Sequence, residues 1–450
     1  MLRMTMDAVI LAAGKSSRMK TSKSKIFYDL CGKSIIENIV NTLKKSGFEN
    51  IVIVSNKEHA KDLSIFGSIA LQEIQNGTAK ACELALQYIS DDFLVINADS
   101  ALIKPDTLKT AKEFFSTRGL DCLLLVSEVD DPTGYGRIVK HESGIRIVEQ
   151  KDANDDILKI SLVSSGIFFL KKDFAIANLP KIDNNNAQGE YYLPDIVKFA
   201  KNCDLFEVEK DEILGINTQK EYSNVRKIMQ KRIIEAHMQN GVVFIDPDTT
   251  YIDINVQIGQ DTLIYPNVHI RKNTKIGKNC IIDTGCIIDS CDISDNVVVK
   301  PYSVLTGSVI QKNCSIGPFS HLRPDNVIKK NVHIGNFVEV KKSILDENTK
   351  ASHLSYIGDA IIGKNVNVGA GTITCNYDGY KKHQTIIGDN VFIGSDTQLV
   401  APVKIGNDCL IAAGTTVTKD TPAFSLILSR VPQQIKENWV IEYRKRNEEK

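Results

Sequence analysis

Aliphatic residues recur at every sixth position through the second half of the chain, from Ile258 to about Val417. A period of six fits neither an α-helix nor an alternating strand. It is typical of a parallel β-helix, in which each unit is a short strand and a corner, and three units close a triangular coil of roughly 18 residues. Glycine or another small residue is expected at the corners, where φ is positive. The residues in register, with one-residue slips after Ile288, Leu305 and Ile357, are Ile258, Ile264, Ile270, Ile276, Ile282, Ile288, Ile293, Val299, Leu305, Ile310, Ile316, Leu322, Ile328, Ile334, Val340, Ile357, Ile362, Val368, Ile387, Ile393, Leu399, Ile405, Ile411 and Val417.

The register is too long for an ordinary isoleucine-rich β domain, and its largest break lies between Val368 and Ile387. The run at 369–380 in this break is longer than a corner needs, so we expect it to leave the prism as a loop. Long loops on a rigid solenoid are where binding sites are usually built.

The first half of the chain has a different pattern, in which short apolar runs alternate with amphipathic segments. The runs at 7–11, 51–54 and 93–96 predict buried strands, and 34–45 and 79–88 predict helices. This alternation indicates a Rossmann-like α/β domain with a parallel sheet between two layers of helices. Ligands bind at the carboxyl ends of such strands, where the small-residue loop 12–19 and Asp99 are expected.

Three further segments organise the rest of the chain. Residues 134–138 predict the start of a hairpin, and the polar run 184–192 predicts a loop that leads to a helix. The charged stretch 219–239, with apolar residues at Val225, Met229, Ile233 and Ile234, predicts a helix between domains. We therefore expect a nucleotide-handling domain at 1–218, a linker helix at 219–240, and a β-helix domain with a polar tail at 241–450.

The composition of the chain argues against several classes of function. The 450 residues include 55 Lys+Arg and 55 Asp+Glu, so no global basic field would recruit nucleic acid or a membrane surface. No apolar run approaches the ~20 residues of a membrane span, and the apolar start at 8–14 is too short for a signal peptide. The ten cysteines form no C-x-x-C pair, which predicts reduced thiols and a cytoplasmic protein.

Candidate chemistry in the first half depends on the loop at 12–19 and on Asp99. Small residues let backbone N–H groups approach phosphates, while Arg18 and Lys25 can meet their charge. The loop is not a P-loop, because the first glycine of that motif would fall on Val9. Asp99, directly after a buried strand, suits a metal carboxylate, and nucleotidyl transfer would need a divalent cation. An ordinary strand–helix turn and a helix cap remain open alternatives on this pattern alone.

Motifs along the whole chain carry a family resemblance. They are Leu11-Ala12-Ala13-Gly14, Arg18-Met19, Gly134-Tyr135-Gly136-Arg137-Ile138, Leu322-Arg323-Pro324, His353-Leu354-Ser355-Tyr356, the loop 369–379 and Ser429-Arg430-Val431-Pro432. With these motifs the chain resembles the bacterial bifunctional N-acetylglucosamine-1-phosphate uridylyltransferase and glucosamine-1-phosphate N-acetyltransferase over nearly all of its length. The resemblance implies a left-handed parallel β-helix that transfers acetyl from acetyl-CoA to glucosamine-1-phosphate. It also implies an N-terminal domain that couples N-acetylglucosamine-1-phosphate to UTP, and a homotrimer.

The resemblance also implies roles for residues of the first half. Asp99 and Asn217 would hold Mg²⁺. The sequence departs from the family pattern at Ser16, Ser24, Ala79, Asn97, Ala98 and Ser164. UTP and the UDP-sugar would be bound by Leu11, Ala12, Ala13, Gly14, Lys25, Gln75, Gly77, Thr78, Gly136, Glu149, Ser164 and Asn217.

In the second half the resemblance makes His353 the general base, since an amine must lose a proton as it attacks a thioester. Without the family, a lone histidine is more often a surface residue. Arg323 and Lys341 would bind the sugar phosphate, and Tyr356 and Asn367 would hold the sugar. The acetyl-CoA contacts would be Ala370, Asn376, Tyr377, Ser395, Ala413 and Arg430.

Four alternative functions remain open on the sequence. The chain could be a regulatory scaffold that binds nucleotide without turnover, or a γ-class carbonic anhydrase with three zinc histidines. It could also be a sugar-1-phosphate nucleotidylyltransferase with an inert β-helix. The last alternative is an acetyltransferase whose N-terminal domain is weakened or only binds nucleotide.

Overall fold

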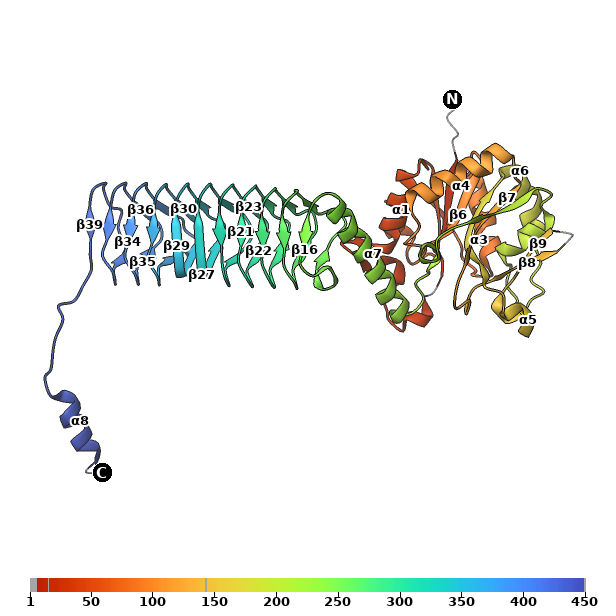
Figure 1. Ribbon diagram of the computed structural model, residues 1–450. Helices are drawn as coiled ribbons and strands as arrows, with labels where there is room; N and C mark the ends of the chain where they lie inside the picture. Colours follow the sequence, from red (N-terminus) through yellow and green to blue (C-terminus); the bar gives the residue numbers. More distant parts are fainter. Residues whose placement is uncertain (1–5, 15, 142–143, 449–450) are drawn as a thin grey trace. The chain divides into compact units, whose positions relative to one another are not determined.

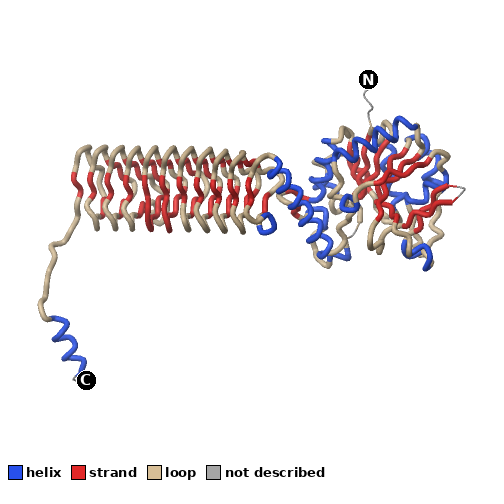
Figure 2. The backbone as a smooth tube through the Cα atoms, in the orientation of Figure 1, coloured by secondary structure: helices blue, strands red, loops and turns tan. Residues whose placement is uncertain are grey.

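The computed structural model describes residues 6–14, 16–141 and 144–448. The chain divides into two compact units, Met1–Arg232 and Ile233–Lys450 (Figure 1, Figure 2). The division falls inside the long helix α7 (Gln219–Gln239), whose ends coincide with the predicted charged helix. None of the helices in the described ranges is both long enough and apolar enough to cross a membrane.

A mixed sheet forms the centre of the first unit, with strand order β11-β7-β10-β6-β1-β4-β5. β1 pairs in parallel with β4 and β6, as predicted, but β10 is antiparallel to both β6 and β7. The expectation of a parallel sheet is therefore wrong for β10, because the chain returns through it from a hairpin. The strands are β1 (Asp7–Leu11), β4 (Ile51–Ser55), β5 (Ser68–Leu71), β6 (Phe93–Asn97), β7 (Cys122–Glu128), β10 (Leu162–Leu170) and β11 (Cys203–Glu207).

Helices cover both faces of this sheet. Phe169 of β10 contacts Phe48 and Phe115, whereas its neighbour Phe168 joins the buried cluster that includes Cys82 of α3. Adjacent residues of a strand point to opposite faces, so α4 and α3 lie on opposite sides. The helices are α1 (Ile35–Lys45), α2 (Ala60–Leu63), α3 (Thr78–Ala85), α4 (Pro105–Arg118), α5 (Asp155–Leu158) and α6 (Lys172–Asn178).

The segments predicted beside the sheet are present with one change of type. β8 (Arg137–His141) and β9 (Gly144–Val148) form the antiparallel hairpin. The polar run before Leu193 leads into a 3-10 helix, η6 (Leu193–Phe199), rather than an α-helix. Pro194 has no backbone N–H to donate, so it suits this first turn.

Parallel strands stack along three faces of a prism in the second unit, which confirms the β-helix (Figure 1). The first row contains β12 (Val243–Phe244), β15 (Leu263–Ile264), β18 (Ile281–Ile282), β21 (Val298–Val299), β24 (Ser315–Ile316), β31 (Asn367–Val368), β34 (Phe392–Ile393), β37 (Leu410–Ile411) and β39 (Leu426–Ile427). The second contains β13 (Tyr251–Ile252), β16 (His269–Arg271), β19 (Ile287–Asp289), β22 (Val304–Thr306), β25 (His321–Leu322), β32 (Ile373–Cys375), β35 (Gln398–Val400) and β38 (Thr416–Val417). The third contains β14 (Gln257–Ile258), β17 (Lys275–Ile276), β20 (Asp292–Ile293), β23 (Ser308–Ile310), β26 (Asn326–Ile328), β28 (Ile344–Leu345), β30 (Ala360–Ile362), β33 (Thr385–Ile387) and β36 (Val403–Ile405).

The register slips have a structural meaning. Ile258 pairs with Ile276 in a full coil, whereas Ile276 pairs with Ile293 in a coil that is one residue shorter. The missing residue is always lost between the second and third rows, for example around Gly307 and Asp359. We call this edge the short corner.

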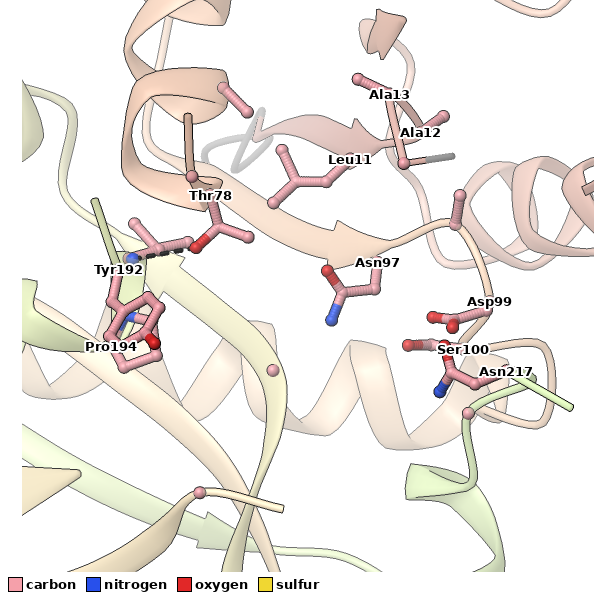
Figure 3. Close-up of a pocket in the computed structure, with 18 of the residues that line it drawn as sticks. Leu11, Ala12, Ala13, Thr78, Asn97, Asp99, Ser100, Tyr192, Pro194 and Asn217 are labelled. Atoms are coloured by element: carbon pink, nitrogen blue, oxygen red, sulfur yellow. Dashed lines mark hydrogen bonds between the residues drawn. The ribbon is translucent and has the colours of Figure 1, made fainter. Parts of the chain in front are cut away.

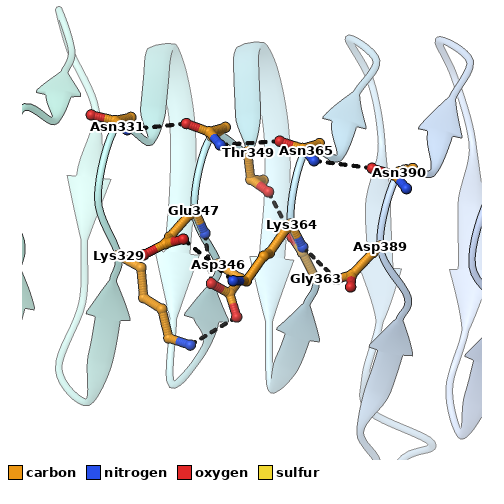
Figure 4. Close-up of polar contacts among 11 residues, drawn as sticks. Lys329, Asn331, Asp346, Glu347, Thr349, Gly363, Lys364, Asn365, Asp389 and Asn390 are labelled. Carbon is orange, nitrogen blue, oxygen red and sulfur yellow. Dashed lines mark hydrogen bonds and ion pairs between the residues drawn. The ribbon is translucent and has the colours of Figure 1, made fainter.

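A second edge, between the third and first rows, carries a ladder of asparagines with positive φ. Each side-chain amide donates to the next asparagine along the prism at 3.0–3.2 Å, except that of the last, Asn390, which donates to Asp408 Oδ1 at 3.0 Å (Figure 4). Asparagine tolerates the left-handed region, so these corners need no glycine, contrary to expectation. The ladder consists of Asn296, Asn313, Asn331, Asn348, Asn365 and Asn390.

The third edge, between the first and second rows, places bulky residues at positive φ. Tyr302, Phe319 and Phe337 stack with ring centroids 5.3 and 5.6 Å apart, and Leu354 follows them. Two long strands, β27 (His333–Lys341) and β29 (Lys350–Gly358), continue around this edge. We call it the histidine corner, because His353 lies on it.

The predicted loop is shorter than expected. Residues 369–375 stay in the prism, and Thr374 pairs with Leu399 in the inward register. The chain leaves the prism only from Asn376 and returns at Thr385, at the short corner.

Candidate functional sites

One cavity of about 1200 Å³ opens at the carboxyl ends of β1 and β6 (Figure 3). Loops far apart in the sequence line it, and all of the predicted N-terminal binding residues are among its lining. They are Leu11, Ala12, Ala13, Gly14, Lys25, Gln75, Gly77, Thr78, Asp99, Gly136, Glu149, Ser164 and Asn217.

Cationic side chains converge on the two predicted metal ligands in this cavity. The Lys25 ammonium lies 2.5 Å from Asp99 Oδ2 and 2.9 Å from Asn217 Oδ1. Arg18 also donates to Asn217 Oδ1, at 2.9 Å. The two oxygens therefore already meet two positive charges, those of Lys25 and Arg18. Figure 3 shows Asp99 and Asn217 on the same side of the cavity.

This oxygen pair fits Mg²⁺. A carboxylate and an amide oxygen are hard ligands, and Mg²⁺ usually takes few protein ligands beside phosphates and water. Gly215 keeps the space beside them free, because a Cβ there would lie 3.5 Å from both Asp99 Oδ2 and Asn217 Nδ2.

Close backbone packing shapes another side of the cavity. Gly77 has φ +128°, and a Cβ there would meet the Tyr191 carbonyl oxygen at 2.4 Å, so only glycine fits. Thr78 Oγ1 accepts a hydrogen bond from the Leu193 N–H at 2.9 Å (Figure 3). Gln75 Nε2 donates to the Ala13 carbonyl at 2.8 Å, which ties this side to the small-residue loop.

Gly136, Glu149 and Ser164 meet at a further part of the cavity. A Cβ on Gly136 would lie 3.2 Å from Glu149 Oε1, and the Gly136 carbonyl accepts from the Ser164 N–H at 2.9 Å. Burial raises the pKa of Glu149, and nearby Asp152 and Asp195 act in the same direction. The raised pKa marks Glu149 as a carboxyl group in a poorly solvated site.

Several lining residues were not assigned from the sequence. Tyr192 OH accepts from Gln188 Nε2 at 2.6 Å, and both residues line the cavity together with Glu190. The polar run that contains them was the available signal, but it indicates a loop without showing what the loop faces.

His353 lies on the histidine corner with its side chain exposed. Its Nδ1 is 2.8 Å from Asn336 Oδ1, on the neighbouring strand where the two residues pair in register. An amide oxygen only accepts hydrogen bonds, so Nδ1 carries the proton and Nε2 keeps a lone pair. Asn336 is thus an orienting residue that sequence reasoning did not assign.

The predicted acetyl-CoA contacts continue along the same corner. The Leu354 carbonyl accepts from Gly371 N–H at 2.7 Å, and the Ala370 carbonyl accepts from Asp396 N–H at 2.7 Å. The Ser395 carbonyl accepts from the Gly414 N–H of the next coil at 2.8 Å. Arg430 Nε donates to the Ala413 carbonyl at 3.1 Å. Residues Ala370, Ser395, Ala413 and Arg430 therefore follow His353 in one row.

The predicted sugar-phosphate residues gather near the short corner. Arg323 forms an ion pair with Glu339 at 3.0 Å, and Glu339 is in register with Tyr356 on the adjacent strand. Lys341 ends the same strand as Glu339, and its ammonium lowers the pKa of Lys382. Two lysines that approach each other suit a dianion, so Lys382 is a further candidate that the sequence did not reveal.

The loop from Asn376 is tied to this group. Asn376 Nδ2 donates to Asp359 Oδ2 at 2.6 Å and lies 3.4 Å from Tyr356 OH. Tyr377 is mostly exposed, and its hydroxyl donates to the Gly379 carbonyl. Asn367, by contrast, lies in the first row of strands, on a different face from Tyr356. Within one chain these two predicted sugar contacts are not brought together.

Family models match both units. Residues 8–141 match the MobA-like NTP transferase domain, and residues 384–419 match the bacterial transferase hexapeptide of six repeats. Residues 246–323 and 304–397 match the GMPPB C-terminal domain. These matches agree with the α/β domain, with the parallel β-helix predicted from the period of six, and with the left-handed form that the family resemblance implied.

Full-length relatives cover both units at once. The bifunctional protein GlmU of Geotalea uraniireducens is 46% identical over 447 residues, covering 96% of this chain and 98% of the relative. That of Caldanaerobacter subterraneus is 44% identical, covering 97% of both chains. That of Thermodesulfovibrio yellowstonii is 46% identical, covering 98% of this chain and all of the relative. They confirm the resemblance drawn from the motifs: the chain belongs to the family of bifunctional GlmU proteins, which are uridylyltransferases and N-acetyltransferases of UDP-N-acetylglucosamine synthesis.

Proposed function

We propose that the two reactions are carried out by the two groups of residues described above. Residues 1–218 would form the uridylyltransferase domain, 219–240 the linker helix, and 241–450 the acetyltransferase domain. The observation that carries the proposal is the single row of residues on the histidine corner, from Asn336 through His353 to Arg430, joined by hydrogen bonds from coil to coil.

In acetyl transfer, His353 Nε2 accepts the proton that the amine of glucosamine-1-phosphate loses. The amine nitrogen forms a bond to the acetyl carbon, the C–S bond of acetyl-CoA breaks, and the thiol of CoA leaves. Asn336 holds the imidazole so that the Nε2 lone pair faces outward. The acetyl-CoA arm would lie along Ala370, Ser395 and Ala413, where the side chains are small.

Arg323 and Lys341, together with Lys382, would bind the phosphate of glucosamine-1-phosphate. The planar guanidinium supplies directed hydrogen bonds and the ammonium groups supply point charges. Tyr356 and Asn376 lie beside these cations and would contact the sugar ring and the cofactor.

In uridylyl transfer, a phosphate oxygen of N-acetylglucosamine-1-phosphate attacks the α-phosphorus of UTP and pyrophosphate leaves. Arg18 and Lys25 would pair with the triphosphate, and Gln75, Gly77 and Thr78 would contact the uracil. Mg²⁺, held by Asp99 and Asn217, would neutralise charge on the phosphates. Gly136, Glu149 and Ser164 would face the sugar.

We further propose that three copies assemble side by side and complete the acetyl-transfer sites. Four large side chains form an exposed row on the histidine corner, with between 50% and 62% of their surface accessible to solvent. They are Tyr302, Phe319, Phe337 and Leu354. Such a row is typical of a protein interface. A second copy would also supply the Asn367 that one chain holds away from Tyr356. Light scattering should give a trimer, and an active, stable monomer would contradict this proposal.

The compartment is proposed as the cytoplasm, because all ten cysteines are free thiols and eight of them are buried. The product, UDP-N-acetylglucosamine, is a precursor of peptidoglycan and lipopolysaccharide.

The test is to assay each half-reaction separately with the full chain. Acetyl transfer is followed by the thiol released from acetyl-CoA, with glucosamine-1-phosphate as acceptor. Uridylyl transfer is followed by pyrophosphate release, with and without Mg²⁺. Both activities are expected, and a preparation that turns over only one pair of substrates would overturn the assignment for the other unit.

A further inference from the structure

Arg137 is the largest fully buried side chain of the described residues, with 2% of its surface exposed. It begins β8 and is held from both sides, because it pairs with Val148 of β9 and with Val163 of β10. It does not line the cavity, and none of the proposed steps uses it. Burying a guanidinium costs free energy unless its donors are satisfied, so its presence here calls for a reason.

The guanidinium joins two pieces of backbone. Nη1 donates to the Tyr135 carbonyl, and Nη2 lies 3.4 Å from the Leu158 carbonyl, at the end of α5. Nε is buried and has no partner among the described residues. The planar fork can reach two carbonyls at once, which a lysine ammonium on a flexible stem does less well.

Arg137 holds the segment 133–136, which forms the part of the cavity wall next to Glu149. Thr133, Gly134, Tyr135 and Gly136 all line the cavity. Residues 132–135 form a turn, in which the Tyr135 N–H donates to the Pro132 carbonyl at 3.2 Å. The position of this segment matters to Glu149, since a Cβ on Gly136 would lie only 3.2 Å from Glu149 Oε1 and the two groups are therefore tightly packed.

We propose that Arg137 is a positioning residue for the sugar side of the uridylyl-transfer site. By holding the Tyr135 carbonyl it sets where Gly136 and Glu149 stand relative to the sugar phosphate. This inference rests on the proposed function, in which Gly136 and Glu149 face the sugar. It does not extend to the side of the cavity assigned to UTP, because Gly14, Lys25 and Gln75 belong to other loops.

The experiment compares R137K, which keeps the charge but loses the fork, with R137M, which loses both. Steady-state kinetics of uridylyl transfer by the full chain is measured with UTP and N-acetylglucosamine-1-phosphate varied in turn. R137K should raise KM for the sugar phosphate roughly tenfold, as expected for one charge-assisted hydrogen bond, with KM for UTP changed less than about twofold. R137M should raise it further, and acetyl transfer should be unaffected in both.

Arg232→Lys is the matched control. Arg232 also donates to a backbone carbonyl, that of Leu102, at 2.5 Å, but it does not line or border the cavity wall. It should leave both KM values unchanged. If R137K leaves KM for the sugar phosphate unchanged, as Arg232→Lys should, or if it raises both KM values together, Arg137 is only structural and the proposal is overturned. If R137M does not fold, R137K alone decides.

Glu149→Gln separates this inference from the proposed function beneath it. A Glu149→Gln enzyme with an unchanged KM for the sugar phosphate would show that the sugar does not bind at this wall. In that case the site assignment fails as well as the inference. A raised KM in Glu149→Gln with no effect of R137K would leave the site in place and overturn the role of Arg137 alone.

Discussion

The two sites of this chain are built in opposite ways. The cavity of the first unit collects side chains from many loops that are far apart in the sequence, and it encloses about 1200 Å³ within one chain. The site on the β-helix is a surface row, in which each coil adds one or two residues at a fixed step. The residues proposed for the first site all line one cavity of one chain, whereas those proposed for the second are divided between two faces of the prism.

This contrast follows from the backbone of each unit. In the α/β unit β1, β4 and β6 run parallel, so the loops at their carboxyl ends lie together at one edge of the sheet. In the prism every coil repeats the last, so a site can differ from its surroundings only where the repeat is disturbed. The disturbances lie where the function is proposed: β27 and β29 run around the histidine corner, and the loop from Asn376 leaves at the short corner.

If the two sites are independent, the largest separation of activities should come from His353. His353→Ala should lower acetyl transfer by about 10²–10⁴-fold, the usual worth of a positioned general base, and leave uridylyl transfer unchanged. Acetyl-CoA binding, measured by calorimetry, should change little, since the proposed contacts lie on other coils. His269→Ala, on a distant coil of the same prism, is the control. Near-normal acetyl transfer in His353→Ala would place the base elsewhere.

The reciprocal test uses Asp99. Asp99→Asn should lower uridylyl transfer by about 10²–10³-fold, because it removes the only carboxylate of the proposed metal pair, while acetyl transfer continues. Asp106→Asn, an exposed residue at the start of α4, should have no effect. A folded Asp99→Asn enzyme that loses both activities would show that the two sites are coupled after all.

A smaller effect should come from the lysine pair at the short corner. Lys382→Ala removes one of the two ammonium groups that approach each other, and should raise KM for glucosamine-1-phosphate about tenfold. Lys381→Ala changes the neighbouring residue of the same loop and should leave KM unchanged. An equal rise in both variants would indicate a general loss of positive charge rather than a phosphate contact.

The two units also differ in how much of their structure could be predicted from the sequence. The period of six predicted the prism, because the inward position of the third row, beginning with Ile258 and Ile276, is aliphatic in every coil. The predicted loop was too long because Thr374, which occupies an inward position, is polar. The aliphatic pattern is therefore interrupted at a coil that keeps its register in the structure. The pairing of Asn336 with His353, and the approach of Lys341 to Lys382, depend on coil length and loop path, which no local pattern reports.

In the α/β unit β1, β4, β6, α1 and α3 were predicted from the sequence, but the direction of β10 was not. A fully buried strand has the same apolar run whether it is parallel or antiparallel. The family motifs identified the lining residues assigned to UTP and the sugar but not Gln188, Glu190 or Tyr192. The role proposed for Arg137, although this residue lies inside the motif Gly134–Ile138, follows only from its contacts.

The smallest expected effect tests whether the first unit is weakened where it departs from the family pattern. Ser16 has φ +52°, a conformation that costs a residue with a Cβ about 1–2 kcal/mol. Its hydroxyl also lies 3.4 Å from the Lys25 N–H, a long contact that helps to place Lys25. Ser16→Gly should relieve the strain and raise kcat/KM for UTP roughly two- to fivefold.

Ser16→Ala is its counterpart, because it keeps the strained backbone and removes only the hydroxyl. It should lower kcat/KM for UTP slightly, so the two variants should move in opposite directions while acetyl transfer stays constant in both. If Ser16→Gly and Ser16→Ala change uridylyl transfer equally, the hydroxyl decides and the backbone does not. If neither variant changes uridylyl transfer, the loop has already adapted to serine, and the first unit has lost nothing by this departure.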